Sequence, residues 1–223
     1  MPPSISSGIQ VRPSIATGGT VDAVQDRESL LERLNQAVRL PEDFGGLPTV
    51  VRLLDRLAAV QPSRGDHVWI PDTNGRLAPS AMLRQSFPDA EVHVVASQYG
   101  EDAHRRGWLR LDRTLTPAEH SVVVDTAVVW SRNNRSLQEV VDEFGPPSVI
   151  FGSTDPDRPK TISYTTSDPA APVVAFHLGF APPEADTGSD EGPSTSPVLL
   201  AVRVHDGFVG GWEVTPLGES RFG

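Results

Sequence analysis

The clearest hydrophobic periodicity in the chain begins at residue 137. Four apolar residues recur at the spacing i, i+3, i+4 and i+7, namely Leu137, Val140, Val141 and Phe144. This spacing places them on one face of an α-helix. Ser136 and Glu139 form a capping-box pattern at the start of the run, and Gly145 followed by two prolines ends it. The pattern predicts a short helix over 137–144.

From residue 148 onward the pattern changes to an alternation of apolar and polar residues. A period of two is typical of strands with one buried face. It predicts strands over 148–151, 160–165, 172–180, 197–205 and 208–215. We therefore expect residues 132–223 to form a helix followed by an antiparallel meander. The segment 181–196 is rich in Pro, Gly, Ser and acidic residues and has no large apolar residue, so it predicts a disordered loop.

The register of the last hairpin depends on the length of its loop. A two-residue turn at Asp206 and Gly207 would place Trp212 on the face of Arg203. A three-residue loop over 205–207 would instead pair Leu200 with Trp212 and unite the apolar residues on one face. We predict the three-residue loop, because a single apolar face can be buried.

The N-terminal part begins with a segment of low hydrophobicity. Residues 1–25 are rich in Pro, Ser, Gly and Thr, and we expect a flexible tail. Apolar residues with helical spacing follow over 27–39, and again after Pro48, which suits the first turn of a helix.

Strand-like patterns are interspersed with these helices. Residues 67–70 and 91–96 resemble short strands, so the pattern predicts a mixed α/β region over 26–131. Its last segment, 117–130, starts with a capping box but is rich in valine, and helix and strand both remain open for it. The whole pattern predicts an α+β protein: a mixed α/β region, then a short helix and an antiparallel meander.

Composition narrows the possible functions. The chain has 223 residues, a formal net charge of −10 and no cysteine. The acidic charge argues against a nucleic-acid binder, which needs cations to neutralise phosphates. The lack of cysteine excludes disulfides, thiol catalysis and cysteine-ligated metal sites. No phosphate-binding loop, dinucleotide fingerprint or zinc-binding helix motif is present, so we expect no cofactor and no metal.

The expected location follows from further features of the sequence. No apolar stretch resembles a signal peptide or reaches the roughly 18 residues that a membrane span needs. The basic residues are 18 arginines and a single lysine, Lys160, a skew typical of a GC-rich coding genome. We therefore expect a bacterial cytoplasmic protein with no membrane contact.

One group of polar residues could carry chemistry. Strand alternation could bring His177, Arg203, His205 and Glu213 to one face of the sheet. Imidazole, guanidinium and carboxylate groups together could form an acid–base site or an anion-binding patch. The same pattern also describes an ordinary solvated sheet face. Because no positioned nucleophile or metal accompanies these residues, we assign no catalytic residue from the sequence.

Two stretches resemble known families of binding proteins. The helix, loop and strands over 136–164 resemble the helix–loop–strand unit of β-lactamase-inhibitor-protein-like folds, with Gly145, Pro147, Ser148 and Tyr164 among the matching residues. That unit also occurs in small outer-membrane-assembly lipoproteins. The resemblance implies a short helix packed on an antiparallel sheet and a role in binding another protein.

The second stretch, 30–57, resembles the region of barstar-like ribonuclease inhibitors where two helices meet. The matching residues are Leu40, Pro41, Glu42, Phe44 and Gly45. This resemblance implies an inhibitor whose acidic turn contacts an enzyme.

Together these observations predict a non-catalytic protein-binding module, specifically a bacterial immunity or inhibitor protein that masks a toxin or enzyme. An acidic chain is steered electrostatically towards a basic protein partner. The candidate contacts are acidic residues of the helix-joining turn and of the 181–196 loop, namely Glu42, Asp43, Glu184, Asp190 and Glu191. Two alternatives remain: an enzyme of unrecognised family that uses the His/Arg/Glu sheet face, and a structural subunit of a larger bacterial assembly. The oligomeric state stays open.

Overall fold

The computed structural model describes residues 18–60, 91–181, 196–205 and 211–222. Their secondary structure runs in the order α1 (Gly18–Arg39), α2 (Gly46–Val60), α4 (Val92–Arg105), α5 (Pro117–Trp130), α6 (Leu137–Phe144), β1 (Val149–Gly152), β2 (Lys160–Tyr164), β3 (Val173–Gly179), β4 (Val198–His205), β5 (Trp212–Val214) and α7 (Pro216–Phe222). The α+β class is confirmed, with helices first and strands grouped after them. The strand predicted at 67–70 lies outside the described residues.

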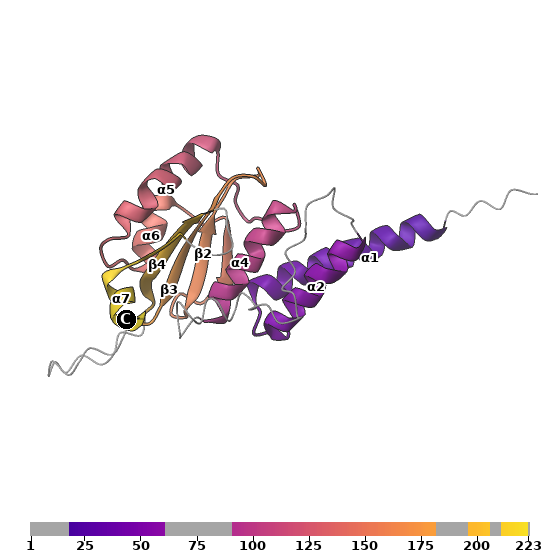
Figure 1. Ribbon diagram of the computed structural model, residues 1–223, viewed down its shortest axis with the longest axis horizontal. Helices are drawn as coiled ribbons and strands as arrows, with labels where there is room; N and C mark the ends of the chain where they lie inside the picture. Colours follow the sequence, from indigo (N-terminus) through magenta and orange to yellow (C-terminus); the bar gives the residue numbers. More distant parts are fainter. Residues whose placement is uncertain (1–17, 61–90, 182–195, 206–210, 223) are drawn as a thin grey trace, which may run out of the picture.

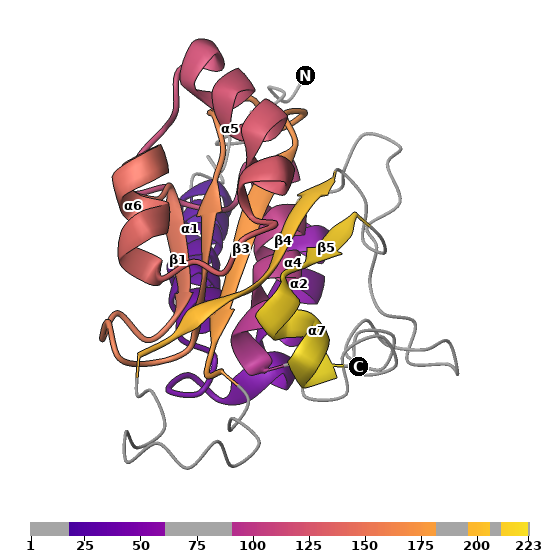
Figure 2. The same cartoon turned by 90° about the vertical axis from the view of Figure 1, so that its left-hand side faces the viewer.

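The strands form one antiparallel sheet in the order β1-β2-β3-β4-β5, which confirms the predicted meander. Helices cover both faces of this sheet. Helix α4 lies on one face with α1 and α2 beyond it, and α5 and α6 lie on the other (Figure 1). Figure 2 shows α7 beside β4 and β5, where the chain ends. The molecule is therefore layered, with the sheet between two helical layers.

The two sequence patterns with the strongest capping signals both form helices. In α6, Glu139 N donates to Ser136 Oγ at 3.2 Å and Ser136 N donates to the Glu139 carboxylate at 2.8 Å, while Gly145 takes a φ of 76° at the end. The valine-rich segment 117–130 is the helix α5, and its capping box joins Thr116 and Glu119 in the same way. The cap and the packing of the buried α5 residues outweigh the small helix penalty of valine.

Helix α4 corrects the strand predicted at 91–96. Residue 93 and all residues from 95 to 104 are buried, because α4 lies between the sheet and the α1–α2 pair. Val95 and Tyr99 belong to the core shared with α1 and α2, while the polar side of α4 faces the sheet, so the helix has no solvent-exposed face that marks it as a helix. The short run of β-branched residues at its start therefore resembled a strand.

Helix α1 begins earlier than predicted. Its backbone is helical from Gly18, inside the segment 1–25 that was expected to be a flexible tail. Residues 20–39 contain neither glycine nor proline, so nothing in this stretch interrupts the helix on the N-terminal side of its packed part. The predicted disordered loop at 181–196 lies outside the described residues, apart from Ala181 and Ser196.

The last hairpin also differs from its prediction. Trp212 pairs with Arg203 and not with Leu200, so its side chain lies on the α4 face of the sheet. There its ring centroid lies 4.3 Å from the ring of His177 and 5.8 Å from the Arg203 guanidinium carbon. Cation–π and ring contacts on the polar face thus replace the apolar alignment that the sequence favoured.

Two hydrophobic cores hold the layers together. One joins α1, α2 and α4 to the buried β1 residues Val149 and Phe151, with the partly buried Trp212 and Val214 of β5 packed against it. The other joins α5 and α6 to the opposite face of β2, β3 and β4, with Phe144, Tyr164 and Phe176 in mutual ring contact. Between α4 and the central strands the buried residues are mostly polar, so this interface differs in kind from both cores.

A glycine sets the close approach of α4 to β1. A Cβ atom added at Gly100 would lie closer to the Phe151 ring than van der Waals contact allows. In an unhindered helix, Gly→Ala raises stability by up to about 1 kcal/mol. Here we expect Gly100→Ala to lower the free energy of unfolding by about 1–3 kcal/mol, because Phe151 is buried and cannot move away freely.

Urea unfolding of the Gly100→Ala variant measures whether the substitution lowers or raises the free energy of unfolding. The exposed α5 residue Ser121 provides the control, since Ser121→Ala is expected to change stability by less than about 0.5 kcal/mol. A stabilised Gly100→Ala protein would show that α4 and β1 are not in close contact.

Candidate functional site

A cleft with a volume of about 770 Å³ opens where three connections of the fold meet. These are the α1–α2 turn, the start of α4 and the β1–β2 connection, with Phe180 after β3 completing the wall. Segments far apart in the sequence thus enclose one concave surface. Clefts of this size are common binding sites in proteins.

The α1–α2 turn is fixed by its own backbone. Phe44 N donates to Leu40 O at 3.2 Å and Gly46 N donates to Pro41 O at 2.6 Å. Gly45 and Gly46 take φ values of 86° and 73°, which glycine adopts at little cost. This turn holds Glu42 and Asp43 at the cleft.

The β1–β2 connection is equally well defined. Asp155 N donates to Ser153 Oγ at 3.1 Å, and Asp157 N donates to Asp155 Oδ1 at 3.0 Å. The buried ammonium of Lys160 donates to the Asp155 carbonyl. Burial lowers the pKa of Lys160, while Asp155 and Asp157 act in the opposite direction. This wall of the cleft is therefore a pre-formed surface.

Carboxylates outnumber cations along the cleft. Its acidic residues come from all three connections, namely Glu42, Asp43, Glu91 and Asp155, and Arg158 is the arginine among the lining residues. Glu91 lies 2.8 Å from His93 Nε2 and forms an ion pair with Arg221 at 3.6 Å. Glu42 and Asp43 are exposed and form no ion pair with any described residue. The turn therefore contributes net negative charge to the cleft.

The predicted partner contacts fall into two groups. Glu42 and Asp43 both line the cleft. Glu184, Asp190 and Glu191 lie outside the described residues, so the structure does not place them.

The four residues of the alternative sheet-face site do not all lie on one face of the sheet. His177 and Arg203 lie on the α4 face, and both touch Trp212. Glu213 pairs with Val202 and therefore lies on the opposite face, where it is exposed. The side chain of His205 is outside the described part of the structure. Only two of the four residues are thus shown to share a site.

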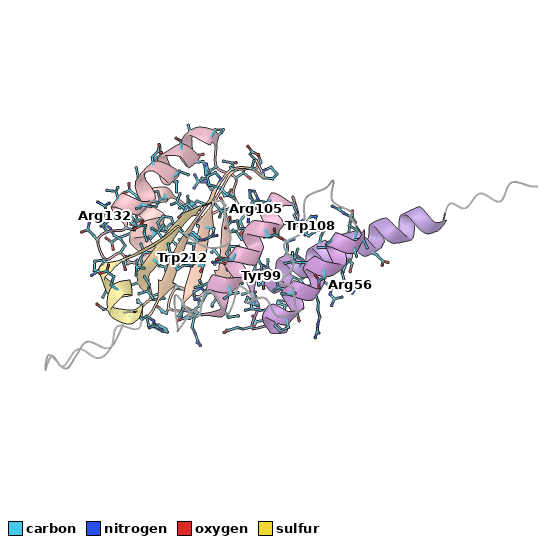
Figure 3. The ribbon with its side chains drawn as sticks, in the orientation of Figure 1. Arg56, Tyr99, Arg105, Trp108, Arg132 and Trp212 are labelled. Carbon is cyan, nitrogen blue, oxygen red and sulfur yellow. The ribbon has the colours of Figure 1, made fainter. Side chains whose placement is uncertain are left out.

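That shared site is buried beneath α4. His177 is 4% exposed and Arg203 is 1% exposed. Arg203 pairs with Glu101 of α4, which also contacts Arg105 at 3.2 Å. Figure 3 shows Trp212 on the sheet and Arg105 at the end of α4. Burial lowers the pKa of Arg203 to about 10. A substrate could reach these groups only if α4 moved.

A second set of contacts links this interface to the cleft. Thr161 Oγ1 lies 2.9 Å from His93 Nδ1 and 2.8 Å from His177 Nδ1. Just after the end of β2, Thr165 Oγ1 lies 3.2 Å from His104 Nε2. His93 is both a cleft residue and a member of this buried network.

Sequence reasoning missed the α4 residues of the network, His93 and Glu101. His93 was placed in the strand predicted at 91–96, and Glu101 lies in a polar stretch that suggested ordinary solvated charge. The polar residues Thr161 and Ser163 of β2, with Thr165 just after it, were visible as alternation but suggested a solvated face. In the structure all three are buried under α4.

Other classes of site find no support in the described residues. Within them, no group of three or more His, Asp or Glu side chains is arranged to hold a metal ion. In the same part of the chain, no helix is long and apolar enough to cross a bilayer. No protein-family model, curated protein or solved structure matches this chain. The function must therefore be inferred from the cleft and the buried network themselves.

Proposed function

We propose that this protein is a non-catalytic binding module that receives a basic segment of a partner protein in the cleft. The observation that carries the proposal is the pair of exposed carboxylates, Glu42 and Asp43, held at the cleft on a rigid turn without an ion pair to any described residue. A lysine or arginine of the partner would supply the missing countercharge.

Apolar surface beside these charges supports the same conclusion. Phe180 lines the cleft and is 37% exposed, and Phe44 of the α1–α2 turn is 41% exposed. Aromatic side chains beside charged groups are typical anchors of protein interfaces. The formal charge of −10 would also accelerate association with a basic partner.

Within this proposal, the finer function is that of an immunity or inhibitor protein. Such a protein needs a preformed surface that covers a site on its target and no chemistry of its own. The rigid α1–α2 turn and β1–β2 connection are compatible with that task, because a pre-organised surface loses little entropy on binding.

The two alternatives have weaker support. Catalysis at His177 and Arg203 would require α4 to uncover them. A subunit role would need an extended apolar surface, and the exposed Val122 and Val129 of α5 are the observation that favours it.

The test is a charge reversal at the turn. A partner would first be isolated by affinity capture from the host lysate and purified, and its Kd would be measured by calorimetry. We expect Glu42→Lys combined with Asp43→Lys to raise the Kd at least about tenfold, a loss of about 1.4 kcal/mol of binding free energy.

The matched control reverses another adjacent acidic pair. Asp142 and Glu143 are exposed on α6, on the other side of the sheet from α4. Asp142→Lys with Glu143→Lys changes the net charge by the same amount and is expected to change the Kd less than about threefold at moderate salt. If both variants lost the same amount of affinity, the loss would come from the overall charge of the protein and not from the turn. An unchanged Kd in the turn variant would remove the cleft from the interface.

A further inference from the structure

The hydroxyl of Thr161 lies between two histidines. His93 Nδ1 approaches it from α4 at 2.9 Å, and His177 Nδ1 approaches it from β3 at 2.8 Å. The other nitrogen of His93, Nε2, lies 2.8 Å from the Glu91 carboxylate. The other nitrogen of His177 has no hydrogen-bond partner among the described residues. The four side chains form a chain of contacts from the cleft to the α4–sheet interface.

Proton counting determines the direction of each bond. A carboxylate only accepts, so His93 Nε2–H donates to Glu91. If His93 is neutral, its Nδ1 has no hydrogen and accepts from the Thr161 hydroxyl. Thr161 has only one hydrogen, so its oxygen must then accept from His177 Nδ1–H. In this state His177 is the Nδ1–H tautomer, and its Nε2 carries a lone pair.

A second proton on His93 reverses the direction of the two hydrogen bonds to Thr161. His93 Nδ1–H then donates to the Thr161 oxygen, and the Thr161 hydroxyl donates to His177 Nδ1. His177, still neutral, becomes the Nε2–H tautomer. Its buried Nε2 changes from an acceptor to a donor without any movement of a heavy atom.

The surroundings keep His177 neutral while His93 gains charge. Burial lowers the pKa of His177 well below its usual value, and a positive charge on His93 lowers it further. His177 packs on Trp212 of β5, whose ring also lies beside Arg203 of β4, and Arg203 is paired with Glu101 of α4.

Charged groups from several elements lie in the cleft that His93 lines. Glu91 belongs to the same helix start and is also contacted by Arg221 of α7. The cleft contributes charged residues from two other elements, namely Glu42, Asp43, Asp155 and Arg158. Among these groups, Glu91 is the one in direct contact with His93.

We propose that Thr161 transmits the protonation state of His93, in the cleft wall, to the tautomer of the buried His177. The relay is a proton-sensitive device of the fold itself and does not depend on the proposed function. It converts a proton at the cleft into a reversal of hydrogen-bonding polarity between α4 and the sheet.

Histidine tautomers can be measured by long-range proton–nitrogen NMR on the full chain labelled with nitrogen-15 histidine. The variants His93→Gln and His177→Gln assign the two sets of signals. Between about pH 8 and pH 5, where histidines ordinarily titrate, we expect His177 to change from the Nδ1–H to the Nε2–H form with the same midpoint as the second proton of His93. A His177 signal that keeps one tautomer throughout this range overturns the relay.

Two valine substitutions, one in β2 and one just after it, make the test specific. Thr161→Val removes the shared hydroxyl at nearly constant volume and is expected to abolish the tautomer change of His177. Thr165→Val removes the buried hydroxyl beside His104, just after the end of β2, and is expected to leave the change intact. A tautomer change that persists in Thr161→Val, or disappears equally in both variants, overturns the role of Thr161. Backbone amide spectra confirm that each variant is folded.

Discussion

Replacing Arg203 by methionine is expected to lower the free energy of unfolding by about 3 kcal/mol. The substitution leaves Glu101, which is 3% exposed, as a buried carboxylate without its main countercharge, and such losses ordinarily cost about 3–5 kcal/mol. Arg105 remains 3.2 Å from Glu101 and offsets part of the loss, which places the value at the lower end. Urea unfolding followed by circular dichroism measures the change.

A second substitution separates buried charge from lost packing. Adding Glu101→Gln to Arg203→Met removes the orphaned charge, so the double variant is expected to be more stable than Arg203→Met alone. Arg132→Met serves as the control, because Arg132 is exposed at the far side of the molecule from α4 (Figure 3), and a change below about 0.5 kcal/mol is expected. If Arg203→Met were no more harmful than Arg132→Met, the buried ion pair would not stabilise the fold.

Stability is also expected to fall steeply below about pH 6.5 because of His177. Burial holds the pKa of this imidazole well below its usual value, so the native state stays unprotonated where the unfolded chain already binds a proton. The unfolded state therefore binds more protons between the two pKa values, and stability decreases as the pH falls through that window. One such group contributes a slope of about 1.4 kcal/mol per pH unit.

Urea unfolding between about pH 7.5 and pH 5 compares the wild type with His177→Gln. The variant lacks this imidazole, so its stability is expected to depend less on pH by about that slope. Burial also lowers the pKa of His104, and His104→Gln is expected to remove a further part of the dependence. Parallel pH profiles for the wild type and His177→Gln would contradict the burial of His177 in the native state.

The two buried sets of contacts show how this protein departs from a simple layered fold. The α4–sheet interface contains an ion pair and a histidine–threonine–histidine contact where most layers bury apolar side chains. Such an interface is sensitive to charge and protonation, because each buried polar group depends on its partner. Both large predictions test this property directly.

Short-range patterns were sufficient for much of the fold. The capping box at Ser136 with the spacing after it predicted α6, and alternation predicted each strand of the meander to within a few residues. These signals are local, because a cap or an alternating face is set by residues a few positions apart. For the same reason, the acidic α1–α2 turn could be recognised as a candidate contact from the sequence.

Long-range packing decided the remaining features. Helix α4 resembled a strand because residues 91–96 are rich in valine, and only the packing of the sheet and the α1–α2 pair shows that this segment is the start of a helix buried on both sides. The register of β5 depended on Trp212 meeting His177 and Arg203. The cleft and the contact of His93 with Thr161 join residues that are remote in sequence. No local sequence pattern encodes these contacts, because they form only when separate elements pack against one another.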